Sequence, residues 1–280
     1  MNNKTLTLTI VIPVYNEHGY LKACLDSIAK QSVMPDEVIV VDNNSTDKSV
    51  QIAKSYPFVK LMGETRQGVV FARNKGFNAA TSDIIGRIDA DTVLPEDWVQ
   101  RVAAEFEDPK VAAVTGPVSY YDMPLPRLNY QVNHLMCKFT HRWSSDGPFL
   151  YGSNMAIRRS AWDSVKKQVC QDQDIHEDID LAIHLLKADY PINYTKKILA
   201  KASGRRANDS LAGFVEYVAM HRRAYTRHNL HNFAMYFAMF MWILGYFFIH
   251  PWRDIWYSIY SRSKKHYPFS RKVRKNPMSS

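Results

Sequence analysis

Short apolar runs alternate with segments of helical periodicity through the first half of the chain, and this alternation constrains the fold most. Runs rich in β-branched residues predict strands at 6–13, 37–41, 59–62 and 84–88. Apolar residues at helical spacing predict helices at 20–29, 47–55, 68–80 and 95–107, the second of them capped by Ser45 or Thr46. Strands that alternate with helices in this way usually pair in parallel. We therefore expect an α/β fold in which a mostly parallel sheet is flanked by helices.

Acidic residues follow three of the predicted strands. Glu17 lies just beyond the first strand, Asp42 follows the second, and Asp89 and Asp91 follow the fourth. The carboxyl ends of parallel strands share one edge of the sheet, where ligands bind, so these side chains are expected to converge. Crowded carboxylates raise one another's pKa unless a cation or hydrogen-bond donors compensate, as a divalent metal and a nucleotide would. The sequence has neither a GxGxxG fingerprint nor a GxxxxGK[ST] loop, which argues against dinucleotide and P-loop binding.

The segment Asp89-Ala90-Asp91 places two carboxylates two residues apart where the fourth strand ends. If the backbone turns there, both face one ion, which suits hard oxygen ligation of a Mg²⁺ or Mn²⁺ ion that bridges a diphosphate. A pair of this kind standing alone is also typical of a loop that caps the next helix, here before Pro95. The interpretation therefore depends on the motifs around it.

Six motifs in order resemble the inverting glycosyltransferases of family 2, in particular membrane-associated bacterial members. They are IVIPVYNE at 10–17, VVDNNSTD at 40–47, GVVFARNKG at 68–76, DADTVLPEDW at 89–98, GSNMAIRR at 152–159 and HEDIDL at 176–181. The resemblance covers residues 6–205 and implies the GT-A fold of that family, a nucleotide-binding α/β fold. It also implies a metal-dependent hexosyltransferase that uses a nucleotide sugar, in this interpretation a UDP-sugar.

The resemblance assigns one set of residues to the nucleotide sugar and its metal. Asp91 would bind Mg²⁺ or Mn²⁺, and Asp89 would contact the ribose or the same ion. Arg73 would contact the base or the phosphates, with a solvated helix residue as the alternative. The metal would neutralise the diphosphate as it leaves. The complete set implied for the nucleotide sugar is Pro13, Tyr15, Glu17, Asp42, Arg73, Asp89, Ala90 and Asp91.

His176-Glu177-Asp178 opens a helical pattern, so two carboxylates lie at a helix N-terminus, which stabilises their ionised form. A capping role alone explains an acidic pair at this position. The resemblance instead implies that Asp178 is the general base for the attacking hydroxyl, and that Glu177 contacts the acceptor or the backbone. One positioned base gives a single displacement with inversion at the anomeric carbon and requires no covalent nucleophile.

Two further motifs are assigned to the acceptor and to phosphates. Gly152, Ser153 and Asn154 resemble the turn that lines the acceptor side in this family, where glycine lets the backbone approach closely. Arg205 and Arg206 follow the last strand-like segment, and their guanidinium groups suit the phosphates of the donor or of an acceptor. A basic face next to a membrane is the alternative for this arginine pair.

The C-terminal part of the chain carries the positive charge. The whole chain has 36 Lys and Arg against 27 Asp and Glu, but residues 1–195 have a net charge of −4 and residues 196–280 one of +13. An amphipathic helix is predicted at 211–228 and an uncharged apolar helix at 233–249. This combination favours contact with an anionic membrane surface.

The length and the flanking charges of the apolar helix indicate whether this part spans a membrane or lies at its surface. Its 17 residues span about 25 Å, slightly less than a bilayer core of about 30 Å. Lys and Arg flank it on both sides, so the positive-inside tendency places both ends on the cytosolic side of the cytoplasmic membrane. An interfacial or re-entrant helix satisfies both constraints, and a buried core helix is the alternative. We thus expect a catalytic domain at 1–205 and a membrane-associating helical segment with a basic tail at 206–280.

Membrane attachment favours a lipid-linked or glycolipid acceptor. A polyprenyl-phosphate sugar synthase is the alternative activity, and a catalytically inactive, nucleotide-sugar-binding membrane scaffold is the alternative of another class. The chain lacks the QxxRW motif and the multiple spans of processive polysaccharide synthases, so a single transfer is expected. Nucleic-acid binding through the tail is disfavoured, because the tail adjoins an apolar run and has no recognisable binding module.

The spacing of the histidines and cysteines does not indicate a metal site or a redox motif. His221, His228 and His231 have no accompanying carboxylate, so packing or headgroup contact is favoured over metal binding. The three cysteines form no CxxC pair, which favours a reducing compartment. The N-terminal segment predicts a first strand rather than a signal peptide, in keeping with a catalytic part in the cytosol.

Overall fold

The computed structural model describes residues 5–123, 125–143, 149–231, 233–252 and 255. The basic tail beyond the apolar helix lies outside the described residues.

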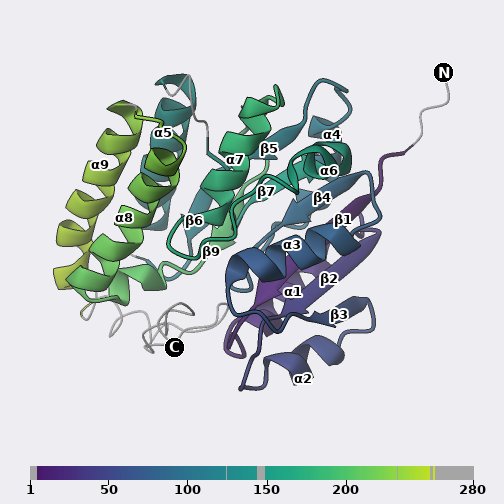
Figure 1. The fold of residues 1–280 in the computed structure, drawn as a ribbon. Coiled ribbons are helices and arrows are strands. Elements are labelled where there is room, and N and C mark those ends of the chain that lie inside the picture. The colour runs from purple at the N-terminus through teal and green to yellow at the C-terminus, as the bar shows by residue number, and fades with distance from the viewer. Residues whose placement is uncertain (1–4, 124, 144–148, 232, 253–254, 256–280) are drawn as a thin grey trace.

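Seven strands form the central sheet. They are β1 (Leu8–Val14), β2 (Glu37–Asp42), β3 (Val59–Gly63), β4 (Ile84–Arg87), β5 (Ala113–Thr115), β7 (Met155–Arg158) and β8 (Ile192–Tyr194). Their order is β3-β2-β1-β4-β7-β5-β8 (Figure 1). Neighbouring strands are parallel except at β7, which runs antiparallel to both β4 and β5. The mostly parallel mixed sheet predicted from the sequence is confirmed.

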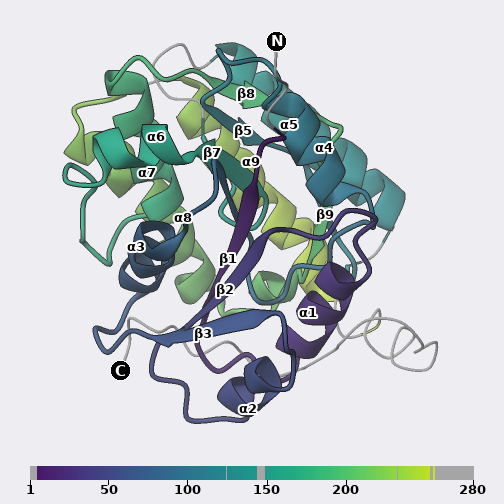
Figure 2. The same cartoon turned by 90° about the vertical axis from the view of Figure 1, so that its right-hand side faces the viewer.

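Helices cover both faces of the sheet, because the strand side chains alternate between two apolar surfaces. The helices are α1 (Leu21–Ala29), α2 (Ser49–Lys54), α3 (Val69–Ala79), α4 (Trp98–Glu105), α6 (Arg159–Val165) and α7 (Glu177–Lys187). Ile10 and Ile12 of β1 share an apolar cluster with α1 and α4, whereas Val11 shares one with α3, α6 and α7. Figure 2 shows these two groups of helices on opposite sides of the strands.

Each helix and strand predicted for the first half of the chain is present, with slightly different ends. The predicted cap of α2 is wrong, because Lys48 holds the N-cap position and makes no side-chain capping bond. Ser45 and Thr46 instead join two loops. The Asn16 backbone N–H donates to Ser45 Oγ at 3.0 Å, and the Thr46 N–H donates to Asn16 Oδ1 at 2.8 Å. These bonds tie together the loops that follow β1 and β2.

A further helical layer lies beside the sheet (Figure 1). It consists of α5 (Pro126–Trp143), α8 (Leu211–Arg227) and α9 (Phe233–Ile249), with the short 3₁₀ helices η1 (Arg205–Asn208) and η2 (His250–Trp252). A small parallel sheet of β6 (Val118–Tyr120) and β9 (Ala200–Ala202) accompanies it. α8 packs against α7 and α9, and α9 also packs against α5.

The apolar run at 233–249 forms α9, which is buried on one side only. Trp242 and Tyr246 pack in the cluster that α9 shares with α8, whereas Phe240 and Phe248 are 60% and 70% exposed. A fully buried core helix, the alternative raised by the sequence, is therefore not what forms. In the described part of the chain, none of the helices combines the length and the hydropathy needed to cross a bilayer.

The domain boundary expected after residue 205 stays a prediction. α7 belongs to the expected catalytic domain and α8 to the expected C-terminal segment. The two helices nevertheless share an apolar cluster in which Ile179 and Ile183 meet Ala224 and Tyr225. The C-terminal helices are thus packed onto the element that carries the predicted base.

Candidate active site

A cavity of about 1040 Å³ lies where the carboxyl ends of the strands meet the layer of α5, α8 and α9. One wall is polar and comes from β4, the loop after it, α7 and η1. It contains Arg87, Asp89, Asp91, Glu177, Asp178, Arg205 and Arg206. The other wall is largely apolar and comes from α5, α8 and α9. It contains Leu128, Val132, Met136, Phe214, Trp242 and Phe248.

The N-terminus of α7 contributes two carboxylates to the cavity wall. Asp178 Oδ2 accepts a hydrogen bond from the Gly152 backbone N–H at 2.8 Å, and Oδ1 accepts one from the Ile179 N–H at 2.9 Å. Glu177 Oε1 lies 2.9 Å from Arg87 Nη2. His176 holds the N-cap position, so neither carboxylate caps the helix from there. The structure brings both predicted residues to the cavity.

Burial raises the pKa of Asp178 and that of Glu177. The nearby Asp89 carboxylate acts in the same direction on both groups. The Arg87 guanidinium opposes this effect without cancelling it. A carboxylate with a raised pKa is a stronger base, which suits abstraction of a proton from a hydroxyl group.

Arg87, at the end of β4, holds the carboxylates of this wall together, and sequence reasoning missed it. Its Nη2 lies 3.0 Å from Asp89 Oδ1 and 2.9 Å from Glu177 Oε1, and 4% of the side chain is exposed. Burial lowers the pKa of Arg87, but Asp89, Glu177 and Asp178 outweigh burial, so the net shift is upward. The signal in the sequence is a charged residue that closes an otherwise apolar buried strand.

Gly152 lets the Arg87 side chain approach the backbone. A Cβ atom at this position would lie 1.3 Å from Arg87 Nη1, so any other residue would displace the guanidinium. Gly152 and Ser153 both line the cavity, and their place on the acceptor side stays a prediction. Glycine is therefore required here because the Arg87 side chain lies against the backbone of residue 152.

A second buried arginine neutralises the carboxylates at the strand ends. Arg205 donates two hydrogen bonds to the Glu17 carboxylate, at 2.8 and 2.6 Å, and its Nη2 lies 2.9 Å from Asp91 Oδ2. Its guanidinium carbon lies 4.4 Å from the centre of the Tyr20 ring. Burial lowers the pKa of Arg205, but Asp91 and Glu17 raise it by more. Glu17 therefore supports Arg205 and is not in the cavity wall.

Asp89 and Asp91 both line the cavity, and as a donor set they fit Mg²⁺ or Mn²⁺. Mg²⁺ is commonly bound by one or two carboxylates, with waters and substrate phosphates completing its shell. The Asp89 side chain is 39% exposed, whereas Asp91 is buried. An ion at this position would share Asp89 with Arg87 and Asp91 with Arg205. The two guanidinium groups thus already balance part of the negative charge that the sequence led us to assign to a metal.

Four residues predicted for the nucleotide sugar lie elsewhere on the sheet. Pro13 lies near the carboxyl end of β1, Tyr15 follows that strand, and Asp42 is the last residue of β2, where it pairs with Val14. None of the three lines the cavity, and their contacts with a nucleotide stay predictions. Ala90 is buried in the apolar cluster that packs against α1 and α4. Only its backbone could therefore contact a nucleotide.

Arg73 and Asn154 are fully buried away from the cavity, which corrects two predictions. Arg73 Nη1 donates to the Glu177 carbonyl oxygen at 3.3 Å, and burial lowers the pKa of Arg73 to about 10. Asn154 Oδ1 accepts from Trp98 Nε1 at 2.9 Å, and its Nδ2 donates to two backbone carbonyls. Arg73 supports the start of α7, and Asn154 supports the turn after Gly152. Neither side chain is accessible to a nucleotide or an acceptor.

Arg206 is the most accessible of the predicted phosphate ligands. Its guanidinium carbon lies 4.3 Å from the centre of the Tyr217 ring, and its Nη1 lies 3.3 Å from Asp209 Oδ2. The side chain is 27% exposed and lines the cavity. A phosphate of either the donor or the acceptor would find a guanidinium fork here.

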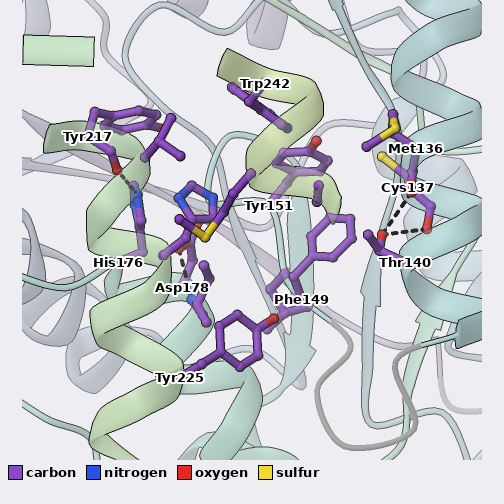
Figure 3. Close-up of a pocket in the computed structure, with 16 residues that line it drawn as sticks. Met136, Cys137, Thr140, Phe149, Tyr151, His176, Asp178, Tyr217, Tyr225 and Trp242 are labelled. Atoms are coloured by element: carbon purple, nitrogen blue, oxygen red, sulfur yellow. Dashed lines mark hydrogen bonds between the residues drawn. The ribbon is translucent and has the colours of Figure 1, made fainter. Parts of the chain in front are cut away.

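A small pocket of about 90 Å³ adjoins the cavity at Asp178 (Figure 3). Asp178 lines both spaces, as do Tyr151, Tyr217 and Trp242. His176 Nε2 lies 3.0 Å from the Tyr217 carbonyl oxygen, and burial lowers the pKa of His176 to about 4. Asp178 is thus surrounded by aromatic rings and by a neutral imidazole, which accounts for the effect of burial on its carboxyl group.

The sequence profile described as glycosyl transferase family 2 matches residues 9–165, more than half of the chain. The chain belongs to glycosyl transferase family 2. The matched part includes β1 to β7 and the carboxylates Asp42, Asp89 and Asp91, but it ends before α7. The profile therefore does not cover Glu177 and Asp178, and their roles stay predictions.

Known proteins resemble this family 2 glycosyltransferase over different lengths. YibD, an uncharacterized glycosyltransferase of Escherichia coli strain K12, is 37% identical over 113 residues, which make up 39% of this chain and 33% of that protein. The mannosyltransferase PcManGT of Pyrobaculum calidifontis, solved with GDP-Man and Mn²⁺, has a TM-score of 0.64 at 21% identity, with 94% of this chain and 77% of that chain covered. S. aureus TarS 1-349, solved with UDP-GlcNAc, has a TM-score of 0.55 at 18% identity, with 79% and 66% covered.

These comparisons confirm the family and the α/β fold that the sequence predicts. The structural likenesses establish the α/β fold with its mixed, mostly parallel sheet. The chain spans about a third of the length of YibD. Both solved structures hold nucleotide sugars, with guanine in one and uracil in the other.

Proposed function

We propose that this family 2 glycosyltransferase is a metal-dependent, inverting enzyme. In this proposal it moves a hexose from a UDP-sugar to a lipid-linked acceptor at the cytosolic face of the cytoplasmic membrane. The observation that carries the proposal is that Asp178 lines the same cavity as Asp89 and Asp91. The nucleotide sugars bound by solved structures of this fold support the class of donor and leave its base open.

Asp178 is the proposed general base. Each of its carboxylate oxygens accepts one backbone hydrogen bond, which fixes its direction and leaves a lone pair for a proton. In the transfer step the acceptor hydroxyl oxygen forms a bond to the anomeric carbon, and its proton passes to Asp178. The bond from that carbon to the diphosphate breaks on the opposite side, so the configuration inverts.

The leaving diphosphate gains charge where the polar wall can balance it. A Mg²⁺ or Mn²⁺ ion on Asp89 and Asp91 would act as a Lewis acid for that charge. Arg206 offers a partly exposed guanidinium to a phosphate oxygen. Arg87 and Arg205 keep the carboxylates in position through their buried ion pairs.

The apolar wall supports the choice of a lipid-linked acceptor. Val132, Trp242 and Phe248 face the cavity opposite the carboxylates, so a lipid chain would lie against them while its polar end reaches Asp178. Exposed apolar side chains on α5 and α9, such as Leu128 and Phe240, extend this surface outward. A large exposed apolar surface is typical of contact with a membrane or another protein.

Replacing Asp178 with Asn tests the assignment of the base. The amide keeps the size of the side chain but cannot accept the proton, so turnover should fall about 10²- to 10⁴-fold. Donor affinity should change little, because the base contacts the acceptor. The measurement is transfer from a panel of UDP- and GDP-sugars to vesicles that contain polyprenyl-linked sugars, together with calorimetric titration of the donors.

Asp163→Asn is the matched control, since this carboxylate lies on the surface of α6 and pairs with Lys166. Its turnover should equal that of the unaltered protein. Full turnover in Asp178→Asn would overturn the assignment of the base, and an equal loss in both variants would show that the loss is not specific to the cavity.

A polyprenyl-phosphate sugar synthase is the second candidate, and the accessible guanidinium of Arg206 in the cavity favours it. Vesicles that contain polyprenyl phosphate in place of polyprenyl-linked sugar distinguish the two activities. Product formed only with polyprenyl phosphate indicates the synthase, and product formed only with polyprenyl-linked sugar indicates transfer to a sugar hydroxyl. An inactive scaffold would bind donors and form neither product.

A further inference from the structure

Four metal-ligating side chains converge outside the cavity. They are Cys170, in the loop before α7, Asp180 and His184 on α7, and His228 at the end of α8. One ligand atom from each lies within 4.8 Å of all the others. Among the residues that the structure describes, no other group of three or more His, Cys, Asp and Glu side chains converges as closely.

Asp180 is the centre of this cluster. Its Oδ1 lies 2.7 Å from His228 Nε2 and 3.6 Å from His184 Nε2, and its Oδ2 accepts a hydrogen bond from the Cys170 backbone N–H at 2.8 Å. The two imidazole rings are nearly perpendicular, with centres 4.9 Å apart. Both rings therefore direct a nitrogen toward the same carboxylate.

The imidazole of His184 is the second observation that indicates a ligand. His184 is 8% exposed, and neither of its ring nitrogens has a hydrogen-bond partner. A buried polar atom without a partner costs about 1–3 kcal/mol, so native structures rarely contain one without a reason. An ion within the cluster would give His184 Nε2 the partner that it lacks.

We propose that Cys170, Asp180, His184 and His228 bind a zinc ion. A thiolate, a carboxylate and two neutral imidazoles form the mixed sulfur, oxygen and nitrogen set that Zn²⁺ binds in four-coordinate, tetrahedral sites. The charges of the thiolate and the carboxylate balance those of the ion, so the site is neutral around its two buried ligands, Asp180 and His184. Binding releases the proton of the Cys170 thiol to solvent.

Small side-chain movements close the cluster around an ion. Zinc bonds of about 2.0–2.3 Å place neighbouring ligand atoms roughly 3.3–3.8 Å apart. The separations here reach up to 4.8 Å, and the 2.7 Å between Asp180 Oδ1 and His228 Nε2 has to lengthen as the ion enters between them. Lys187 Nζ lies 3.1 Å from His228 Nδ1. Because Lys187 is exposed, it can turn to solvent when Nδ1 carries the proton and Nε2 binds the metal. Four protein ligands leave no open position, so the site is structural.

The proposed zinc would connect the two parts of the chain that form the cavity. Asp180 lies two residues after Asp178 on α7, and His228 ends α8, which provides Tyr217 to the cavity wall. Apolar packing already joins the two helices. A zinc ion would add a cross-link close to the proposed base and fix the position of α8.

Zinc and cobalt alone, added to the purified 280-residue protein, test this proposal. We expect one zinc per chain by mass spectrometry of the metal content. We also expect a thiolate-to-cobalt charge-transfer band when Co²⁺ replaces zinc. Cys170→Ser should abolish this band, and His184→Gln should weaken zinc binding by at least about tenfold, since even residues that only orient ligands are worth that much.

His231→Gln is the matched control. The exposed His231 ring takes no part in the cluster, and its Nδ1 lies 3.2 Å from the Tyr236 hydroxyl oxygen. This variant should keep the band and the metal content, and circular dichroism verifies that each variant is folded. Unaltered protein without zinc above background and without the cobalt band would overturn the proposal, as would an unchanged band in Cys170→Ser. Cobalt on Asp89 and Asp91 has oxygen ligands and gives no thiolate band, so the outcome is independent of the proposed sugar transfer.

Discussion

At the scale of the residue, hydrogen-bond partners separate the roles of two adjacent carboxylates. Glu177 is paired with the Arg87 guanidinium, whereas the hydrogen bonds of Asp178 come from backbone N–H groups. The Arg87 charge lowers the pKa of both groups, and burial raises both. Glu177 is the one in a direct ion pair with Arg87, and the role of Asp178 as the base stays a proposal.

Gly152→Ala should damage the site through Arg87. The added methyl group would overlap the guanidinium and disturb its ion pairs with Asp89 and Glu177. We expect the free energy of unfolding to fall by about 1–3 kcal/mol, as is usual for overpacking, and transfer activity to fall as well. Urea unfolding measures the first effect. Gly19→Ala is the control, since a methyl group there meets no atom within 4 Å, and equal effects of the two substitutions would contradict this account.

The sequence predicts some site residues better than others for a physical reason. Asp89, Asp91 and Asp178 stand at the ends of elements whose periodicity is visible in the sequence, so their place at the rim of the sheet follows from the topology. Arg73 also lies on a predicted helix, but it is buried where it meets Glu177, which is 104 residues away. Contacts between residues so far apart in the chain do not alter the local periodicity of the sequence, so periodicity cannot predict them.

At the scale of the element, the 3₁₀ helix η1 connects distant parts of the fold. Its first residue, Arg205, binds Glu17 after β1 and Asp91 after β4. The guanidinium is buried together with both carboxylates. This short element therefore fixes the loops that carry two of the predicted nucleotide-binding carboxylates.

Arg205→Gln should destabilise the protein strongly. The substitution removes the positive charge from beside two buried carboxylates, a change that costs about 3–5 kcal/mol. Denaturation in guanidinium chloride measures it. Arg101→Gln removes an exposed partner of Asp97 and should cost less than about 1 kcal/mol. Similar values for both variants would show that the buried ion pairs contribute little.

Elements with strong local patterns were predictable, and those determined by packing were not. β-branched runs indicate β1 to β4, and the uncharged run of 17 residues indicates α9. β7 has four residues, and its antiparallel direction depends on its neighbours β4 and β5. α5 was not predicted, although Leu128, Val132 and Leu135 recur at helical spacing. These three side chains are exposed, so the sequence pattern does not indicate which face of α5 packs on the rest of the fold.

At the scale of the whole molecule, the exposed apolar side chains gather on the added helical layer. α5 and α9 contribute most of them, including Leu135, Phe240 and Phe248. The sheet and its flanking helices keep their apolar residues inside two clusters. The layer that closes the cavity is thus also the layer suited to a lipid surface.

Binding to vesicles of anionic lipid should depend on this layer. Replacing Phe240 and Phe248 with Ser removes two side chains that would each contribute about 1.5–3 kcal/mol when buried in lipid, so the affinity should fall at least tenfold. Flotation with the vesicles measures the bound fraction. Val33→Ser with Met34→Ser alters two exposed apolar residues in the loop between α1 and β2 and should change nothing. Undiminished flotation of the Phe240 and Phe248 variant would contradict a membrane role for α9.

The bond between Arg205 and Glu17 also bears on how the protein is made. The two residues are 188 positions apart, so at about 5–20 residues per second a ribosome adds the arginine roughly 10–40 seconds after the glutamate. Until Arg205 is added, Glu17 and, once it has been made, Asp91 lack the guanidinium that accompanies them in the finished fold. The loops that carry Glu17 and Asp91 are consequently among the last parts to mature during translation, because they depend on a residue from the C-terminal third of the chain.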